Sequence, residues 1–144
     1  MAEQSFQNHT KWVPWFHFFV QPVFLVNFVY SFFRLKPASF SFDSILGVFV
    51  AAAFVIGAVC LRLMSLTVQD RVIRLEMRLR MERLLPADLK ARIGEFTLGQ
   101  LIALRFASDA ELPDLARAVL KDHLTDKKAI KQMVKNWQPD LLRA

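Results

Sequence analysis

The charged residues of this 144-residue chain are strongly segregated along the sequence. Residues 1–61 contain five of the 32 charged side chains, and residues 62–144 contain the other 27. Twelve of the fourteen phenylalanines precede residue 55. Soluble globular domains intersperse charged and apolar residues, so this distribution argues against a single soluble globule. We expect the N-terminal half to lie in an apolar environment and the C-terminal half to lie in water.

Composition excludes two further classes of protein. The chain is 54% hydrophobic, which excludes intrinsic disorder. Its single cysteine, Cys60, excludes an intrachain disulfide scaffold. His9, His17 and His123 are widely separated, and the sequence contains no Gly-rich phosphate loop, paired metal-ligand motif or nucleophile elbow. We therefore expect a protein that is not an enzyme, with no catalytic residue, no metal site and no cofactor.

Two uncharged segments predict membrane-spanning helices. Residues 12–33 contain no Asp, Glu, Lys or Arg. As an α-helix this segment would be about 33 Å long, enough to cross a hydrocarbon core of about 30 Å. A second uncharged run, 44–61, extends to residue 66 if Arg62 places its guanidinium among the lipid headgroups. The predicted spans are about 12–34 and 44–66, and Pro22 predicts a kink in the first.

The connection between the two spans is short and nearly free of positive charge. Residues 35–43 leave too little chain for anything but an antiparallel hairpin. Arg34 and Lys36 are the positive residues on this side, whereas the flank of the second span is rich in arginine and Lys11 precedes the first. By the positive-inside rule, both termini should face the cytoplasm.

The predicted spans each carry one face of polar or small residues. In the first, an arc of about 140° contains His17, Gln21, Asn27, Ser31 and Arg34. In the second, four small residues project within about 40° of one another: Gly47, Ala51, Ala58 and Ser65. We interpret the two faces as the contact within the hairpin or as a homo-oligomer interface. The alternative is a proton or substrate path in a small homo-oligomeric channel or transport component.

The second helix is predicted to continue far beyond the membrane. Neither Gly nor Pro occurs in residues 62–85, and Pro86 marks the stop, so one helix is expected over about 44–85. One apolar strip has the 4-3-4 spacing of a packing seam and contains Val68, Val72, Leu75 and Leu79. A second strip contains Ile73, Met77, Met81 and Leu84. Two strips predict contact on two sides, with the tail of the chain and with a partner.

Six arginines and no lysine occur in residues 62–83 of this helix. The i,i+4 spacing predicts the ion pairs Asp70–Arg74, Glu76–Arg80 and Arg78–Glu82, which would make a solvated, self-paired surface. The functional alternative is contact with anionic lipid headgroups or with an acidic partner. The arginines expected to make it are Arg71, Arg74, Arg78, Arg80 and Arg83.

Residues 86–144 are predicted to form four short helices of a cytoplasmic module. Capping boxes are expected at 97–100 and 108–111, and Asp126 should open a last helix that ends at Pro139. On that helix four lysines would share one face: Lys127, Lys128, Lys131 and Lys135. A solvated face is the simpler interpretation, and a membrane-tethered nucleic-acid-binding module is the alternative.

Three stretches of the sequence carry a resemblance to a known family. They are Asn-His-Thr-Lys-Trp-Val-Pro-Trp-Phe-His-Phe at 8–18, Gln-Asp-Arg-Val-Ile-Arg-Leu-Glu-Met-Arg-Leu-Arg at 69–80 and Leu-Ile-Ala-Leu-Arg-Phe-Ala-Ser-Asp-Ala-Glu-Leu-Pro at 101–113. Together they resemble a bacterial family of small membrane proteins of unknown function, whose members are sometimes labelled permease-like. The resemblance covers the whole chain and implies a protein of the bacterial inner membrane. It implies no activity and no functional residue.

The sequence thus predicts an all-α membrane protein in three parts. A transmembrane hairpin occupies 1–66, a cytoplasmic extension of its second helix occupies 67–85, and a helical module occupies 86–144. We expect an accessory, scaffold or interaction protein of the bacterial inner membrane, with both termini cytoplasmic. Its expected partners are anionic lipid and either a second copy of the chain or another membrane protein.

Overall fold

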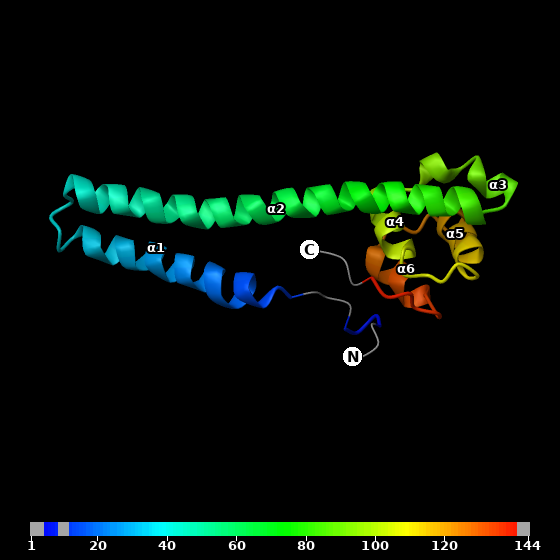
Figure 1. The fold of residues 1–144 in the computed structure, drawn as a ribbon, viewed down its shortest axis with the longest axis horizontal. Helices are drawn as coiled ribbons and strands as arrows, with labels where there is room; N and C mark the ends of the chain where they lie inside the picture. The colour runs from blue at the N-terminus through cyan, green and yellow to red at the C-terminus, as the bar shows by residue number, and fades with distance from the viewer. Residues whose placement is uncertain (1–4, 9–11, 141–144) are drawn as a thin grey trace. The chain divides into compact units, whose positions relative to one another are not determined.

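The structure is a computed structural model that describes residues 5–8 and 12–140. His9 and Lys11, used above, lie outside these ranges. The described residues fold into helices, as Figure 1 shows: the π-helix η1 (Trp15–Val20), α1 (Gln21–Leu35), α2 (Phe42–Leu84), α3 (Ala87–Lys90), the 3-10 helix η2 (Ile93–Glu95), α4 (Leu98–Leu104), α5 (Leu112–Lys121) and α6 (Lys127–Met133). Within these ranges the one β-type pairing is an isolated bridge between Ala107 and Trp137. The predicted all-α class is confirmed.

The described chain divides into two compact units, and α2 contributes to both. One unit contains residues 12–66, and the other contains 5–8 and 67–140. A continuous helix was predicted over about 44–85, and α2 spans Phe42–Leu84, so this prediction is confirmed. The segment 67–84, expected to be an extension between hairpin and module, belongs to the same compact unit as the short helices that follow it.

The first unit contains the two helices that are long and apolar enough to cross a membrane, by the criteria of length and composition. They are Trp15–Leu35 and α2, of which residues 42–66 belong to this unit. The irregularity expected at Pro22 takes the form of the π-helix η1 rather than a simple kink in an α-helix. The Gln21 N–H donates to the Phe16 carbonyl, five residues back, directly before the proline that lacks an N–H.

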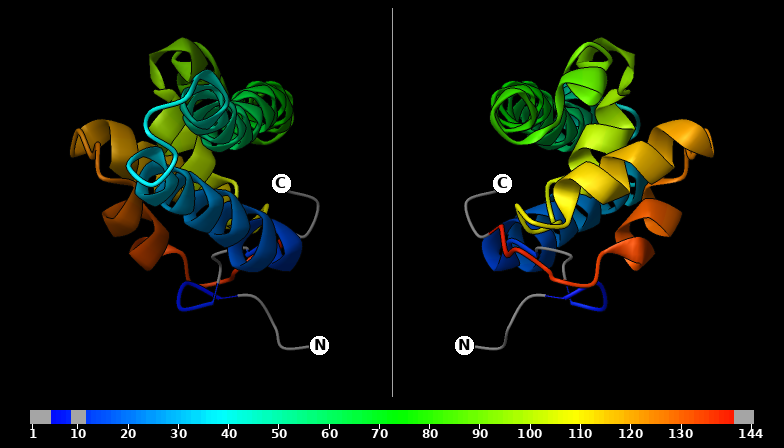
Figure 2. Two further views of the ribbon diagram at one scale, coloured as in Figure 1. Left: turned by 90° about the vertical axis from the view of Figure 1, so that its left-hand side faces the viewer. Right: turned by 90° about the vertical axis from the view of Figure 1, so that its right-hand side faces the viewer.

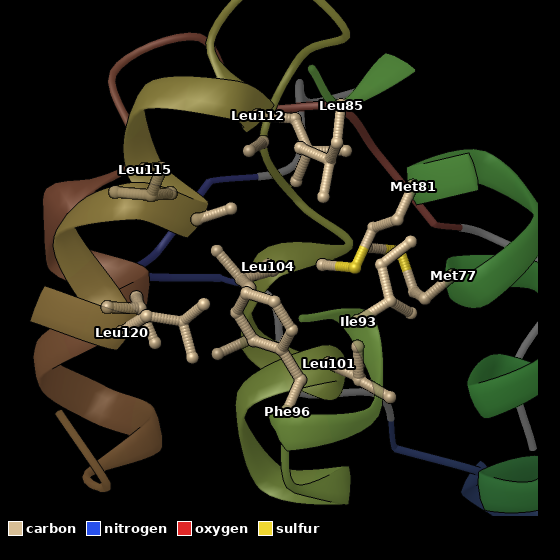
Figure 3. Close-up of a cluster of buried hydrophobic side chains, with 14 of the residues drawn as sticks. Met77, Met81, Leu85, Ile93, Phe96, Leu101, Leu104, Leu112, Leu115 and Leu120 are labelled. Atoms are coloured by element: carbon tan, nitrogen blue, oxygen red, sulfur yellow. The ribbon is translucent and has the colours of Figure 1, made fainter. Parts of the chain in front are cut away.

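The second unit is built around the C-terminal half of α2. Ile73, Met77 and Met81 are 5%, 3% and 0% exposed, so the second predicted strip is part of a hydrophobic core. Figure 3 shows Met77 and Met81 entering the same cluster as Leu101 and Leu104 of α4, and Leu112 of α5 lying beside Leu85. Seen along the long helix, α4, α5 and α6 all lie on one side of α2 (Figure 2).

Two of the predicted helix starts are confirmed by their caps. The Thr97 hydroxyl accepts from the Gln100 N–H at 3.3 Å, and the Gln100 side-chain oxygen accepts from the Thr97 N–H at 2.7 Å, which completes the capping box. The Asp126 carboxylate accepts from the backbone N–H groups of Lys128 and Ala129. These two donors hold the pKa of the Asp126 carboxyl below its ordinary value.

The capping box predicted at 108–111 is wrong. Helix α5 begins at Leu112 with Glu111 as its N-cap residue, and no side chain accepts a capping hydrogen bond at its N-terminus. The Glu111 carboxylate instead accepts from the backbone N–H groups of Lys135 and Asn136, at 2.8 and 3.1 Å. The Glu111 carboxylate is therefore bound by N–H groups of the C-terminal segment and not by the local N–H group that a capping box would use.

The predicted end of the last helix at Pro139 is also wrong, because α6 ends at Met133. The following segment runs beside residues 106–108 instead. The Ser108 N–H donates to the Asn136 carbonyl at 3.1 Å, and the Gln138 N–H donates to the Phe106 carbonyl at 2.7 Å. The Trp137 ring stacks on the Phe106 ring with centroids 4.4 Å apart. These contacts stabilise an extended backbone here more than a further turn of helix would.

Helix α5 ends in a motif that normally contains glycine. His123 has a φ of 48°, and the Leu124 N–H donates to the Val119 carbonyl at 3.1 Å, as in a Schellman motif. A side chain at this left-handed position costs about 1 kcal/mol relative to glycine. We expect His123→Gly to stabilise the unit by about that amount.

The measurement is thermal unfolding of the full-length protein in detergent, with Asp122→Gly as the matched control. Asp122 is adjacent and has a φ of −93°, so glycine there should lower the midpoint. A His123→Gly midpoint at or below that of the unmodified protein would contradict the prediction.

Candidate interaction surface

Arg80 connects α2 to the short helices through a set of hydrogen bonds. Its guanidinium donates to the Asp109 carboxylate at 2.8 Å, to the Gln138 side-chain oxygen at 2.9 Å, and to the carbonyls of Arg105 and Ala107 at 3.1 and 2.6 Å. The Arg80 side chain is 15% exposed. It was expected among the arginines that contact lipid or a partner, and the structure gives it a role inside the chain instead.

The predicted i,i+4 ion pairs along α2 do not form. The ion pairs shown for residues 67–140 join α2 to Asp109 or join residues that follow α2, and Asp70, Glu76 and Glu82 are in none of them. Arg80 pairs with Asp109 rather than Glu76 because the Asp109 site adds two carbonyl acceptors. The remaining arginines of the predicted set, Arg71, Arg74, Arg78 and Arg83, have exposed side chains. Arg83 also lies 3.8 Å from the second Asp109 oxygen.

The four lysines expected on one helical face do not share it. Lys135 lies beyond the end of α6, and its N–H donates to Glu111. The Lys131 ammonium lies 5.3 Å from the centre of the Phe106 ring. Lys127 packs its methylenes over Gly99, where a Cβ would come within 3.0 Å of them. Lys127, Lys128 and Lys135 are exposed and Lys131 is half-buried, and Lys135 lies outside the helix that was expected to align all four.

The polar residues of the first predicted span are spread over separate environments. The His17 ring nitrogen Nδ1 lies 3.1 Å from the Val13 nitrogen and 3.0 Å from the Val13 oxygen, and the Ser31 hydroxyl donates to the Asn27 carbonyl at 2.8 Å. Gln21 is half-buried, and Asn27 is exposed. His17 and Ser31 therefore use the backbone of their own helix.

The small residues expected to pack the second span divide into two pairs. Ala51 and Ala58 are buried, at 1% and 6% exposed, whereas Gly47 and Ser65 are exposed. Beside Ala58 lies an apolar groove of about 540 Å³, lined mainly by Phe and small residues: Val13, Phe16, Val20, Phe24, Ala53, Phe54, Gly57, Ala58, Leu61, Arg62 and Ser65. The Phe24 and Phe54 rings contact each other across it, with centroids 5.2 Å apart.

The first apolar strip of α2 has no cover within the described chain. We call its residues Val68, Val72, Leu75 and Leu79 the α2 seam. They are 61%, 48%, 61% and 63% exposed. At about 100° per residue they lie nearly opposite the buried strip of Ile73, Met77 and Met81. Among the described residues that follow Met64 in the sequence, the large apolar side chains that are exposed are these four. The α2 seam is therefore the candidate interaction surface.

Sequence reasoning missed the acceptors that hold Arg80. Asp109 was interpreted as part of a local capping box, and Gln138 was placed at the end of a helix. The available signal was the position of Arg80 beside the apolar strip of Met77 and Met81. A guanidinium that is buried with such a strip needs hydrogen-bond acceptors from elsewhere in the chain. Their identity depends on the tertiary fold.

We expect Arg80→Met to lower the free energy of unfolding by about 2–4 kcal/mol, because Asp109 and two carbonyls lose their donor. Arg78→Met is the matched control on the same helix, and its exposed side chain should change stability by less than about 0.5 kcal/mol. Denaturant unfolding of the full chain in detergent measures both. Equal effects of the two substitutions would refute the role assigned to Arg80.

Comparison with known proteins gives one family. The sequence model of a family described as "Family of unknown function (DUF6526)" matches residues 1–144. No curated protein and no solved structure gives a match.

Proposed function

The chain belongs to the DUF6526 family of unknown function, and we propose that it is a membrane-anchored interaction protein that is not an enzyme. In this proposal α1 and the first half of α2 form a transmembrane hairpin in the bacterial inner membrane. The second half of α2 then presents the helical module and the α2 seam in the cytoplasm. The observation that carries the proposal is the α2 seam, an apolar surface without cover on a helix whose first half is apolar enough to cross a membrane.

The exposure of side chains in residues 12–64 supports the membrane part of the proposal. Phe19, Phe33 and Leu61 are 57%, 74% and 67% exposed, and they belong to helices apolar enough to span a bilayer. Such surfaces are stable in lipid and costly in water. The excess of arginine after residue 61, against the short 36–41 turn, supports cytoplasmic termini.

The contacts of Arg80 and of the buried strip support the scaffold part of the proposal. Because Met77 and Met81 belong to the core, the module and the end of α2 form one packed body. A partner bound to this body would be held close to the membrane without a flexible linker. Arg71, Arg74 and Arg78 lie on the exposed surface of the same helix, where anionic headgroups are the expected additional contact.

Cysteine labelling tests the proposed topology. In a Cys60→Ser background, Ser39→Cys lies in the turn between the two apolar helices, and Lys128→Cys lies on α6. A membrane-impermeant maleimide added to intact spheroplasts should label Ser39→Cys and should label Lys128→Cys only after permeabilisation. The opposite pattern would reverse the topology, and labelling of both in intact spheroplasts would contradict the anchor.

Site-specific photo-crosslinking tests the proposed interaction. A photoreactive amino acid at Leu75, within the α2 seam, should give a covalent protein adduct in native membranes. The same group at Arg74 is the control, because Arg74 is exposed on the same helix outside the α2 seam. An absence of any adduct from Leu75 would contradict the proposed function.

A further inference from the structure

The α2 seam is surrounded by charged residues, which separates it from the lipid-facing surface. Asp70, Arg71, Arg74 and Glu76 alternate with its apolar side chains. A hydrocarbon environment is therefore excluded for the α2 seam by the cost of inserting these charges. In water the four apolar side chains would stay exposed, which is unfavourable. We therefore expect the surface of a protein to cover them.

The spacing of the α2 seam is that of a short coiled coil. Residues 68, 72, 75 and 79 follow the 4-3-4 pattern, which places Val72 and Leu79 at heptad position a and Val68 and Leu75 at position d. The central layers are thus Val at a and Leu at d, the combination that favours two parallel strands. Glu82, at the next d position, ends the apolar run.

The flanking charges complement a parallel second copy. In this register Arg71 occupies position g and Glu76 occupies the following position e, so Arg71 of one copy faces Glu76 of the other, twice by symmetry. Both side chains are exposed, and the ion pairs shown in the described chain include neither. An antiparallel pair would instead bring Arg71 against Arg78.

One flanking contact of the parallel pair joins like charges. Arg78 at position g faces Arg83 at the following position e. Arg83 lies 3.8 Å from an Asp109 oxygen within its own chain, which offsets part of its charge. The two Arg71–Glu76 pairs and the apolar layers therefore decide the orientation.

We propose that the α2 seam binds the α2 seam of a second copy of this chain, as a parallel, in-register pair of helices. The proposal rests on the proposed function, since copies that share one topology in one bilayer direct their α2 helices the same way. It identifies the partner of that surface as the chain itself.

Single cysteines in the full-length Cys60→Ser protein, oxidised in native membranes, test the pairing. Val68→Cys, Val72→Cys, Leu75→Cys and Leu79→Cys should each form a disulfide-linked homodimer, because in-register a and d residues face their own copies. Arg74→Cys, exposed and outside the α2 seam, should give none. Each variant should keep the helical circular-dichroism spectrum of the parent, since these side chains are exposed within their own chain.

Charge exchange tests the orientation. Arg71→Glu places two glutamates opposite each other and should weaken dimerisation about tenfold, and Arg71→Glu with Glu76→Arg should restore it. Dimer fractions in detergent, measured by sedimentation over a concentration series, give both values. Failure of the double variant to recover would overturn the parallel register.

The two proposals fail in different ways. A Leu75 photo-adduct with a different protein, together with no homodimer from any seam cysteine, overturns the self-pairing and leaves the interaction function standing. An absence of both the adduct and the homodimers overturns both proposals. Equal disulfide formation at Arg74→Cys and at the seam cysteines would also overturn the self-pairing, because collision would then explain the cross-links.

Discussion

The structure depends on one constraint, which is that a single helix has to present an exposed apolar surface in one unit and supply core residues to the other. Helix α2 passes from one unit into the other without a break over its 43 residues. Ile73, Met77 and Met81 fill the core on one side, and the Arg80 guanidinium satisfies backbone carbonyls beside them. The burial supplies the free energy of association, and the hydrogen bonds fix how the short helices sit on α2.

Much of the fold could be predicted because the responsible signals are local. The extent of α2 followed from the absence of Gly and Pro before Pro86, and the starts of α4 and α6 followed from Thr97 and Asp126. The existence of two apolar strips followed from periodicity. Which strip the chain itself covers did not, since both have helical spacing and similar hydrophobicity. Only the tertiary fold distinguishes the buried Met81 from the exposed Leu79.

The errors share one physical cause, which is competition from distant partners. Glu111 was expected to cap its own helix and binds the N–H groups of 135–136 instead. Trp137 was expected on a helix and stacks on Phe106 instead. Arg80 was grouped with surface arginines because its acceptors come from residues 25 to 58 positions away. The candidate surface was foreseen as a pattern, whereas its exposure required the structure.

The core that α2 shares with the short helices has a consequence for proteolysis of the chain. Because Ile73, Met77 and Met81 are core residues, a protease that cuts α2 beyond them would release residues 86–140 without part of their packing surface. Such a fragment would expose Leu101 and Leu104 to water and would be a substrate for degradation. Cleavage at this point therefore yields no stably folded C-terminal fragment, because the folded unit includes the end of α2.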